Sequence, residues 1–166
     1  MKFLIALLVA FLLTAFSSIA PVSQDTGLQI PSPQKGERQQ QRRPHYTQVK
    51  IGTTTVDAVI SATDAEQIRG LQFKKKLEAN EGMLFIYQPD KILTHWMKDM
   101  LIPLDMIWMD KNKKIINISA NVPVCQTPPC AVYSSEQPAE YVLEVNAGFA
   151  DQHKIKPGMT MNFSLI

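Results

Sequence analysis

The sequence predicts an α+β fold rich in β-structure: a compact, antiparallel, closed or nearly closed small barrel with one or two short helices. Two observations lead to this prediction. Many short segments with the alternating or β-branched character of strands follow one another between turn signals. A clear helix start occurs once, at the capping box Thr63-Asp-Ala-Glu66. A chain with many strands and little helix buries its apolar faces by curling the sheet.

The elements can be assigned in chain order. Strands are expected at residues 47–51, 54–60, 82–87, 93–97, 104–109, 114–122, 141–146 and 159–165. Gly52-Thr53 and Asp110–Lys113 are turn signals, and the second predicts a hairpin between its flanking strands. A helix should start at Thr63 and end near Gly70, and one or two further helical turns are expected within 148–155.

Only part of the chain is expected to fold. Lys2 precedes an apolar run and then small residues, so residues 1–20 have the layout of a signal peptide or an N-terminal membrane anchor. Residues 21–45 are rich in Pro, Gln and Arg and show no apolar periodicity, which predicts a disordered tether. Residues 46–166 then form a single globular domain in an exported protein, periplasmic or otherwise extracytoplasmic, that associates with the membrane through residues 1–20 if these are retained.

The charge of the domain argues against nucleic acid as a partner. Of the 17 Lys and Arg and 15 Asp and Glu in the chain, Lys2 and the tether account for five and two, which leaves 12 basic and 13 acidic residues in the domain. A strongly basic face is therefore not expected. An unknown small molecule or an envelope protein is the expected partner.

The two cysteines, Cys125 and Cys130, predict a disulfide bond. In an exported protein an even pair is first interpreted as a disulfide, and this pair lies in a proline-stiffened segment. A zinc site would need more ligands, and a thioredoxin-like site would need Cys-x-x-Cys at a helix start. Neither a redox nor a metal role is favoured.

A set of short motifs identifies a family. They are Arg69-Gly70-Leu71, Gly82-Met83-Leu84-Phe85, Trp96-Met97-Lys98, Ile102-Pro103-Leu104-Asp105, and Val142-Leu143-Glu144 with Ala147-Gly148. In this order they resemble the family called domain of unknown function 192, in which a cysteine pair like that of this chain is also frequent. The resemblance implies a compact β-rich fold, often exported, with no established activity. The chain departs from the pattern at Gln72, at Asp99 and at His95, where an aromatic residue such as Phe is common.

Four charged residues lie inside otherwise apolar motifs, at Arg69, Lys98, Asp105 and Glu144. One interpretation is that they form ion pairs that hold loops on a small barrel, since buried charges must be paired. The other is a mixed-charge pocket for a ligand, with Trp96 as its apolar floor. The first is the commoner origin of such charges.

The expected function is that of a non-catalytic ligand-binding or interaction module without cofactor or metal, because the sequence contains none of the usual catalytic signatures. Two alternatives stay open. Two carboxylates suit an enzyme that acts on a hydroxyl-rich or sugar-like substrate. The seven methionines of the domain, with His95 beside Met97, suit a periplasmic Cu(I)-binding protein, although methionine is also an ordinary core residue.

Overall fold

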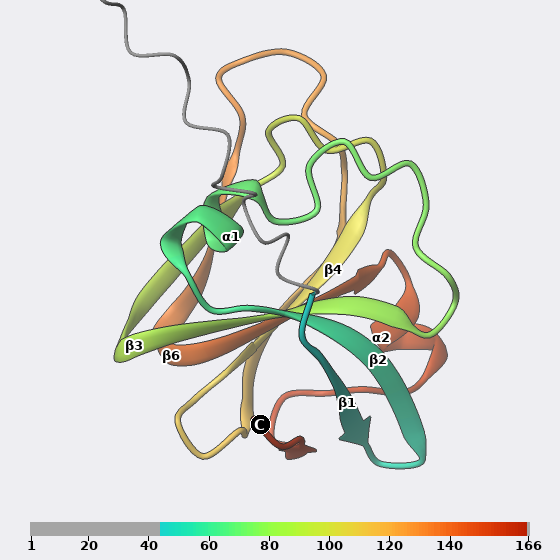
Figure 1. Cartoon of the computed structure of the whole chain (residues 1–166), viewed down its shortest axis with the longest axis vertical. Helices are drawn as coiled ribbons and strands as arrows, with labels where there is room; N and C mark the ends of the chain where they lie inside the picture. The colour runs from blue at the N-terminus through green and yellow to red at the C-terminus, as the bar shows by residue number, and fades with distance from the viewer. Residues whose placement is uncertain (1–43, 166) are drawn as a thin grey trace, which may run out of the picture. The chain divides into compact units, whose positions relative to one another are not determined.

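The computed structural model describes residues 44–165, which form seven strands and two short helices (Figure 1). The predicted signal and most of the predicted tether lie outside the described residues. The elements are β1 (Tyr46–Ile51), β2 (Thr54–Ser61), α1 (Asp64–Arg69), β3 (Glu81–Trp96), β4 (Leu104–Met109), β5 (Ile115–Val122), β6 (Val132–Asn146), α2 (Phe149–Gln152) and β7 (Met161–Asn162). Within residues 44–165, no helix has the length and apolar character needed to cross a membrane.

All seven strands belong to one strongly curled sheet in the order β5-β4-β6-β3-β2-β1-β7. An isolated bridge between Lys114 and Thr160 joins the two edges of the sheet at one end. The result is a half-barrel, so the predicted β-rich, nearly closed architecture is confirmed. Adjacent strands are antiparallel, as expected, except for β2 and β3, which are parallel. Parallel neighbours need a crossover connection, and the segment that contains α1 provides it.

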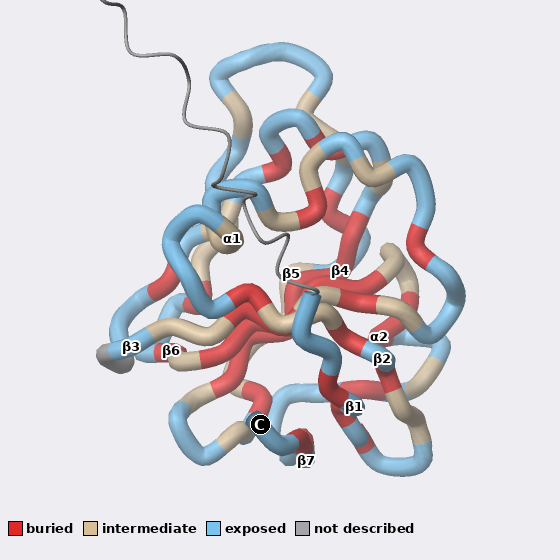
Figure 2. The backbone as a smooth tube through the Cα atoms, viewed as in Figure 1, coloured by how far each residue is buried: buried red, intermediate tan, exposed pale blue. Residues whose placement is uncertain are grey.

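The central strands are buried on both faces (Figure 2). Successive residues of a strand point to opposite faces, and on β4 they alternate between two apolar clusters. The inner cluster draws on every strand and fills the curl of the sheet; it includes Val49, Val56, Leu84, Ile107, Ile115, Leu143 and Met161. The outer cluster covers the opposite face; it includes Leu71, Phe85, Leu93, Met97, Met106, Trp108 and Val142. The candidate site lies on the outer face.

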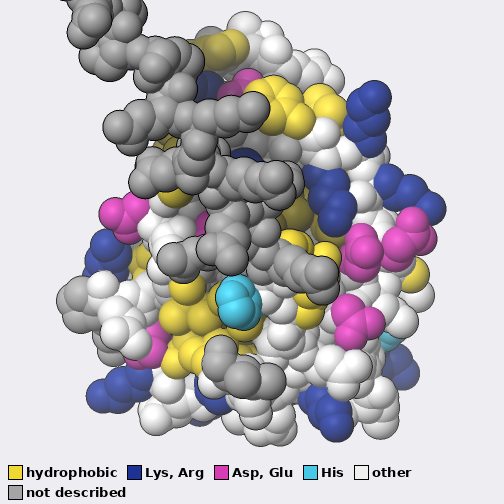
Figure 3. All heavy atoms as spheres, viewed as in Figure 1, with side chains coloured by type: hydrophobic (Ala, Val, Ile, Leu, Met, Phe, Trp, Pro, Cys, Tyr) yellow, Lys and Arg dark blue, Asp and Glu magenta, His cyan; other side chains and the backbone are white. Residues whose placement is uncertain are grey.

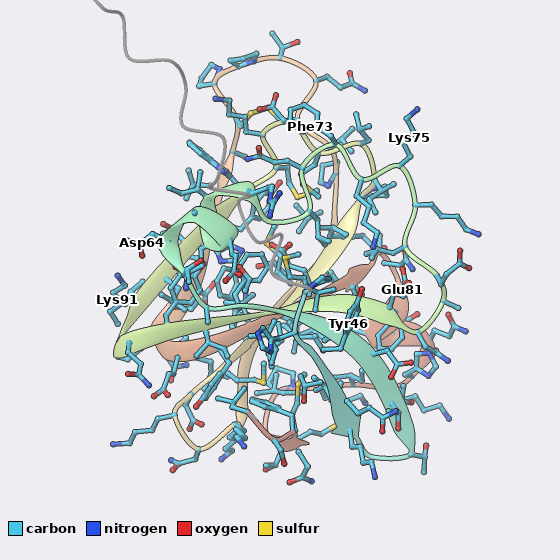
Figure 4. The ribbon with its side chains drawn as sticks, viewed as in Figure 1. Tyr46, Asp64, Phe73, Lys75, Glu81 and Lys91 are labelled. Atoms are coloured by element: carbon cyan, nitrogen blue, oxygen red, sulfur yellow. A yellow bond between two sulfur atoms is a disulfide. The ribbon has the colours of Figure 1, made fainter. Side chains whose placement is uncertain are left out.

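Two strands are longer than predicted. The segments expected at 82–87 and 93–97 are one strand, β3, whose pairing with β6 shifts register between Ile86 and Lys91. Figure 4 places Glu81 and Lys91 at opposite ends of the first half of β3, before the strand turns. Strand β6 starts at Val132 instead of residue 141. Its first half lacks alternation and contains Pro138, but it pairs with the second half of β3 all the same. Bulges of this kind let a strand bend around a core.

The last strand is shorter than predicted: β7 comprises Met161–Asn162, where residues 159–165 were expected. The hairpin of β4 and β5 is confirmed. The disulfide between Cys125 and Cys130 is also present, with a Cα–Cα distance of 5.5 Å. It closes the loop that connects β5 to β6 (Figure 1).

Candidate functional site

A cavity of about 280 Å³ opens between α1 and the second half of β3. Its apolar wall comprises Ile68, Leu71, Phe85, Trp96, Met100 and Val132. Its polar lining includes Gln67, Arg69, Thr94, His95, Lys98 and Glu144, with the phenol of Tyr87. Residues from α1, β3 and β6 and from the loops after α1 and β3 therefore converge on one space, as is typical of small-ligand sites.

Local sequence fixes α1 at the edge of this cavity. The capping box is present: the Thr63 hydroxyl accepts a hydrogen bond from the Glu66 backbone N–H at 3.4 Å, and Glu66 Oε2 accepts one from the Thr63 N–H at 3.0 Å. These backbone N–H groups hold the pKa of Glu66 below its usual value. Gly70, at a positive φ of 45°, ends the helix as predicted. Gln67 then donates a hydrogen bond to the Ile86 carbonyl at 2.6 Å, which ties the helix to β3.

A chain of three hydrogen-bonded side chains lines the floor of the cavity. His95 Nδ1 lies 2.8 Å from Glu144 Oε1, and both side chains are less than a tenth exposed. His95 Nε2 lies 2.8 Å from the Tyr87 hydroxyl. With the carboxylate ionised, Nδ1 donates to it, and Nε2 of a neutral ring then accepts from the Tyr87 O–H group. Each ring nitrogen thus has a partner.

The imidazole of His95 is enclosed by aromatic rings. Phe85 and Trp108 contact it edge-on at centroid distances of 4.8 and 5.2 Å, and the Tyr87 ring is 5.8 Å away. Burial and the negative charge of Glu144 raise the pKa of Tyr87 well above that of a free phenol. Tyr87 therefore stays neutral; because its O–H group is donated to His95, its oxygen lone pairs are left to accept a hydrogen bond in the cavity.

Two cations line the same cavity. Neither Arg69 nor Lys98 forms an ion pair with another residue of the 44–165 segment. The Lys98 ammonium lies 5.7 Å from the centroid of the Trp96 ring. Trp96 is 54% exposed, consistent with a side chain at the mouth of a pocket. On the face of the molecule that Figure 3 shows, charges of both signs are interspersed around groups of hydrophobic side chains.

The structure does not bring the fifth sequence candidate, Asp105, to this site. Register pairs Asp105 with Val145 and Met106 with Glu144, so the side chains of Asp105 and Glu144 point to opposite faces of the sheet. The expectation that all four charged residues share one cleft is therefore corrected. Asp105 instead accepts backbone hydrogen bonds, described below.

This geometry weakens both alternatives raised by the sequence. A glycosidase pair needs two carboxylates on one side of a substrate, ~5–9.5 Å apart, and the sheet separates Asp105 from Glu144. Cu(I) binding at His95 would need a free ring nitrogen, but both are hydrogen-bonded. Within residues 44–165, no group of three or more His, Cys, Asp and Glu side chains is arranged to hold a metal ion.

Sequence reasoning missed Tyr87 and His95 as members of the site. His95 was noted as a departure from the family pattern and as a potential copper ligand, but not as the partner of Glu144. Tyr87 and His95 are eight positions apart, a spacing that places them on one face of a continuous strand. That signal was hidden because residues 82–87 and 93–97 were expected to form two separate strands.

Comparison with known proteins agrees with the fold. One similar crystal structure is that of a protein of unknown function from Novosphingobium aromaticivorans DSM 12444, whose sequence is 32% identical to this chain. The match covers 72% of this chain and 84% of that one, with a TM-score of 0.65. A Sinorhizobium meliloti 1021 protein that carries a provisional description as a transcription regulator is 22% identical, with 73% and 94% covered and a TM-score of 0.65, which shows a shared fold alone. No curated protein matches this chain.

The family is identified by its sequence profile. The profile of the DUF192 family, described as Uncharacterized ACR, matches residues 47–163, which is nearly all of the described domain. Several motif residues take part in the strand pairing or in the cavity. Gly82 of β3 lies between β2 and β6, and Trp96, Lys98 and Glu144 line the cavity. The chain belongs to the DUF192 family.

Proposed function

We propose that this domain is an exported binding module for a small anionic ligand with an apolar body. The observation that carries the proposal is the cavity itself, in which apolar walls, two cations without an ion-pair partner among residues 44–165 and a hydrogen-bonded floor meet. A cavity of about 280 Å³ is close to the lower end of the range for ligand pockets, roughly 300–1,000 Å³. The ligand is therefore about the size of a single ring with its substituents.

The charges of the site favour an anion. Glu144 is the acidic group in the lining, and its charge is already directed at His95. Arg69 and Lys98 are left to pair with a ligand, and a guanidinium is well shaped for a carboxylate or phosphate. Ile68 and Val132 are 71% and 62% exposed, and both line the cavity. Exposed apolar side chains around a pocket are typical of a surface that a ligand covers.

Ligand binding is tested by thermal melts of the purified domain with a panel of aromatic and aliphatic carboxylates, phosphates and sugars. We expect at least one small anion to raise the Tm of the wild-type protein, because ligand that binds only the folded state stabilises it. Lys98→Ala should reduce the shift, whereas Lys111→Ala, which removes an exposed charge in the β4–β5 turn, should leave it unchanged. A panel that shifts no melt, or equal shifts in both variants, would contradict the proposal.

Export is supported by the signal-like pattern of residues 1–20. We expect the mature protein in the extracytoplasmic fraction of the native cell, either shortened at its N-terminus or held on the membrane by it. Cell fractionation followed by mass spectrometry of the N-terminus measures this. A protein recovered from the cytoplasm alone, with Met1 in place, would refute export but leave the cavity proposal standing.

A further inference from the structure

We propose that Tyr87, His95 and Glu144 form a proton relay that opens on the cavity, and that the relay accepts the proton of an acidic hydroxyl group on the ligand. The inference rests on the proposed binding function and adds the ligand's chemical class, a small phenol or enol that binds as its anion. One cavity contains the three features that such a ligand needs: aromatic walls to contact its ring, a base to accept its hydroxyl proton, and cations to pair with the resulting oxyanion.

The hydrogen-bond order fixes the direction of transfer. With Glu144 ionised, His95 Nδ1 donates to the carboxylate, and Nε2 accepts from Tyr87. The lone pairs of the Tyr87 oxygen are then left to accept a hydrogen bond from a ligand. When the ligand O–H bond breaks, its proton passes to the Tyr87 oxygen and the proton of Tyr87 passes to Nε2. The products are a ligand oxyanion, a neutral Tyr87 and an imidazolium.

The charges that surround the relay stabilise these products. Glu144 on β6 lies 2.8 Å from Nδ1, so its carboxylate faces the imidazolium that the transfer creates. Arg69 on α1 and Lys98 after β3 line the cavity in which the oxyanion forms. Phe85 and Trp108 contact the ring edge-on, and Tyr133 is its register partner on β6. Because the pKa of Tyr87 is raised, the phenol passes the proton on and does not hold the negative charge itself.

Packing alone does not account for an imidazole at this position. The ring makes edge-on contacts with three aromatic side chains, which a phenyl ring of similar size also makes. The register neighbours of Glu144 are Met83 and Met106, which offer its carboxylate no hydrogen bond. What histidine adds is a pair of nitrogens that connect a buried carboxylate to a phenol in the cavity wall. That connection is the distinguishing feature of a relay.

The test uses 4-nitrophenol, whose anion absorbs visible light while its neutral form does not. Spectra are recorded with excess protein over a pH series that spans the ionisation of the probe, and binding is measured separately by equilibrium dialysis. We expect the wild-type protein to lower the apparent pKa of the bound probe by about one unit, a tenfold change in its ionisation constant. His95→Phe should bind the probe but lose most of this shift. His153→Phe, which changes a histidine outside the cavity, should keep it.

One further variant keeps the test decisive. Glu144→Gln preserves the shape of the side chain and removes the charge that stabilises the imidazolium, so the shift should shrink even if His95→Phe folds poorly. A full shift in both His95→Phe and Glu144→Gln would assign the effect to Arg69 and Lys98 and overturn the relay. Bound probe with an unchanged spectrum would also overturn it. Absence of probe binding, with an anion from the panel still raising the Tm, would reject the phenol class while leaving the binding function intact.

Discussion

Replacing Asp105 with alanine will lower the free energy of unfolding by about 3–5 kcal/mol, because three backbone donors lose their acceptor together. The carboxylate is fully buried. Its Oδ1 accepts from the N–H groups of Asn121 at 2.7 Å and Gly148 at 3.1 Å, and its Oδ2 accepts from Ala150 at 2.8 Å. Gly148 is the N-cap of α2 and has no side chain to cap the helix, so Asp105 supplies the cap from a neighbouring strand.

Chemical denaturation of the variant, with circular dichroism as the signal, measures this loss. Asp105→Asn retains one carbonyl oxygen and should lose less than Asp105→Ala. Asp57→Ala is the matched control, since that carboxylate is exposed on β2 and accepts one hydrogen bond, from Gln48 at 3.2 Å; the expected change is within about 0.5 kcal/mol. Equal losses for Asp105→Ala and Asp57→Ala would show that Asp105 does not hold these loops.

Gly82→Ala will destabilise the domain by about 2–3 kcal/mol, because the added methyl group has no room. Its Cβ would lie 2.7 Å from the carbonyl oxygen of Glu144 and 3.0 Å from a methyl group of Val56. The first contact is with backbone, so β3 and β6 must move apart. Since β6 carries Glu144, the same change should also weaken ligand binding at the cavity.

The comparison variant is Gly158→Ala. An added Cβ at this position meets nothing within 4 Å, but the backbone has a φ of 94°. The Gly158→Ala variant should therefore lose only about 1 kcal/mol of unfolding free energy, the conformational cost of an alanine at positive φ, and its cavity should be unaffected. Thermal melts and ligand titrations of the two variants separate crowding from backbone strain. A melt of Gly82→Ala that matches wild type would mean that the strands accommodate the methyl group freely.

Local patterns were sufficient to predict most of the fold. The capping box at Thr63, the turn at Asp110 and the alternation in β1 and β2 depend on neighbouring residues, and all three appear as expected. The first half of β6 could not be found this way. Its strand character comes from pairing with β3 residues about 40 positions earlier in the chain, and Pro138 within it argues against a strand when considered alone.

The site was predicted only in part, for a similar reason. Arg69, Trp96, Lys98 and Glu144 were identified as candidates because charged and aromatic residues within apolar motifs are conspicuous, and they do meet at one cavity. Asp105 was conspicuous for the same reason but faces the opposite side of the sheet. The link between His95 and Glu144 spans 49 positions and depends on how β3 bends against β6, which no local pattern encodes.

The bridge between Lys114 and Thr160 has a consequence for the order of folding. Strand β1 is among the first described residues, yet one of its two edges is completed by β7, where Lys50 pairs with Asn162. The bridge likewise cannot form before Thr160 is present to pair with Lys114, next to the β5 edge of the sheet. Contacts between such distant segments carry a large loop-closure entropy and slow folding. A nascent chain therefore keeps both sheet edges open until these late residues have been synthesised.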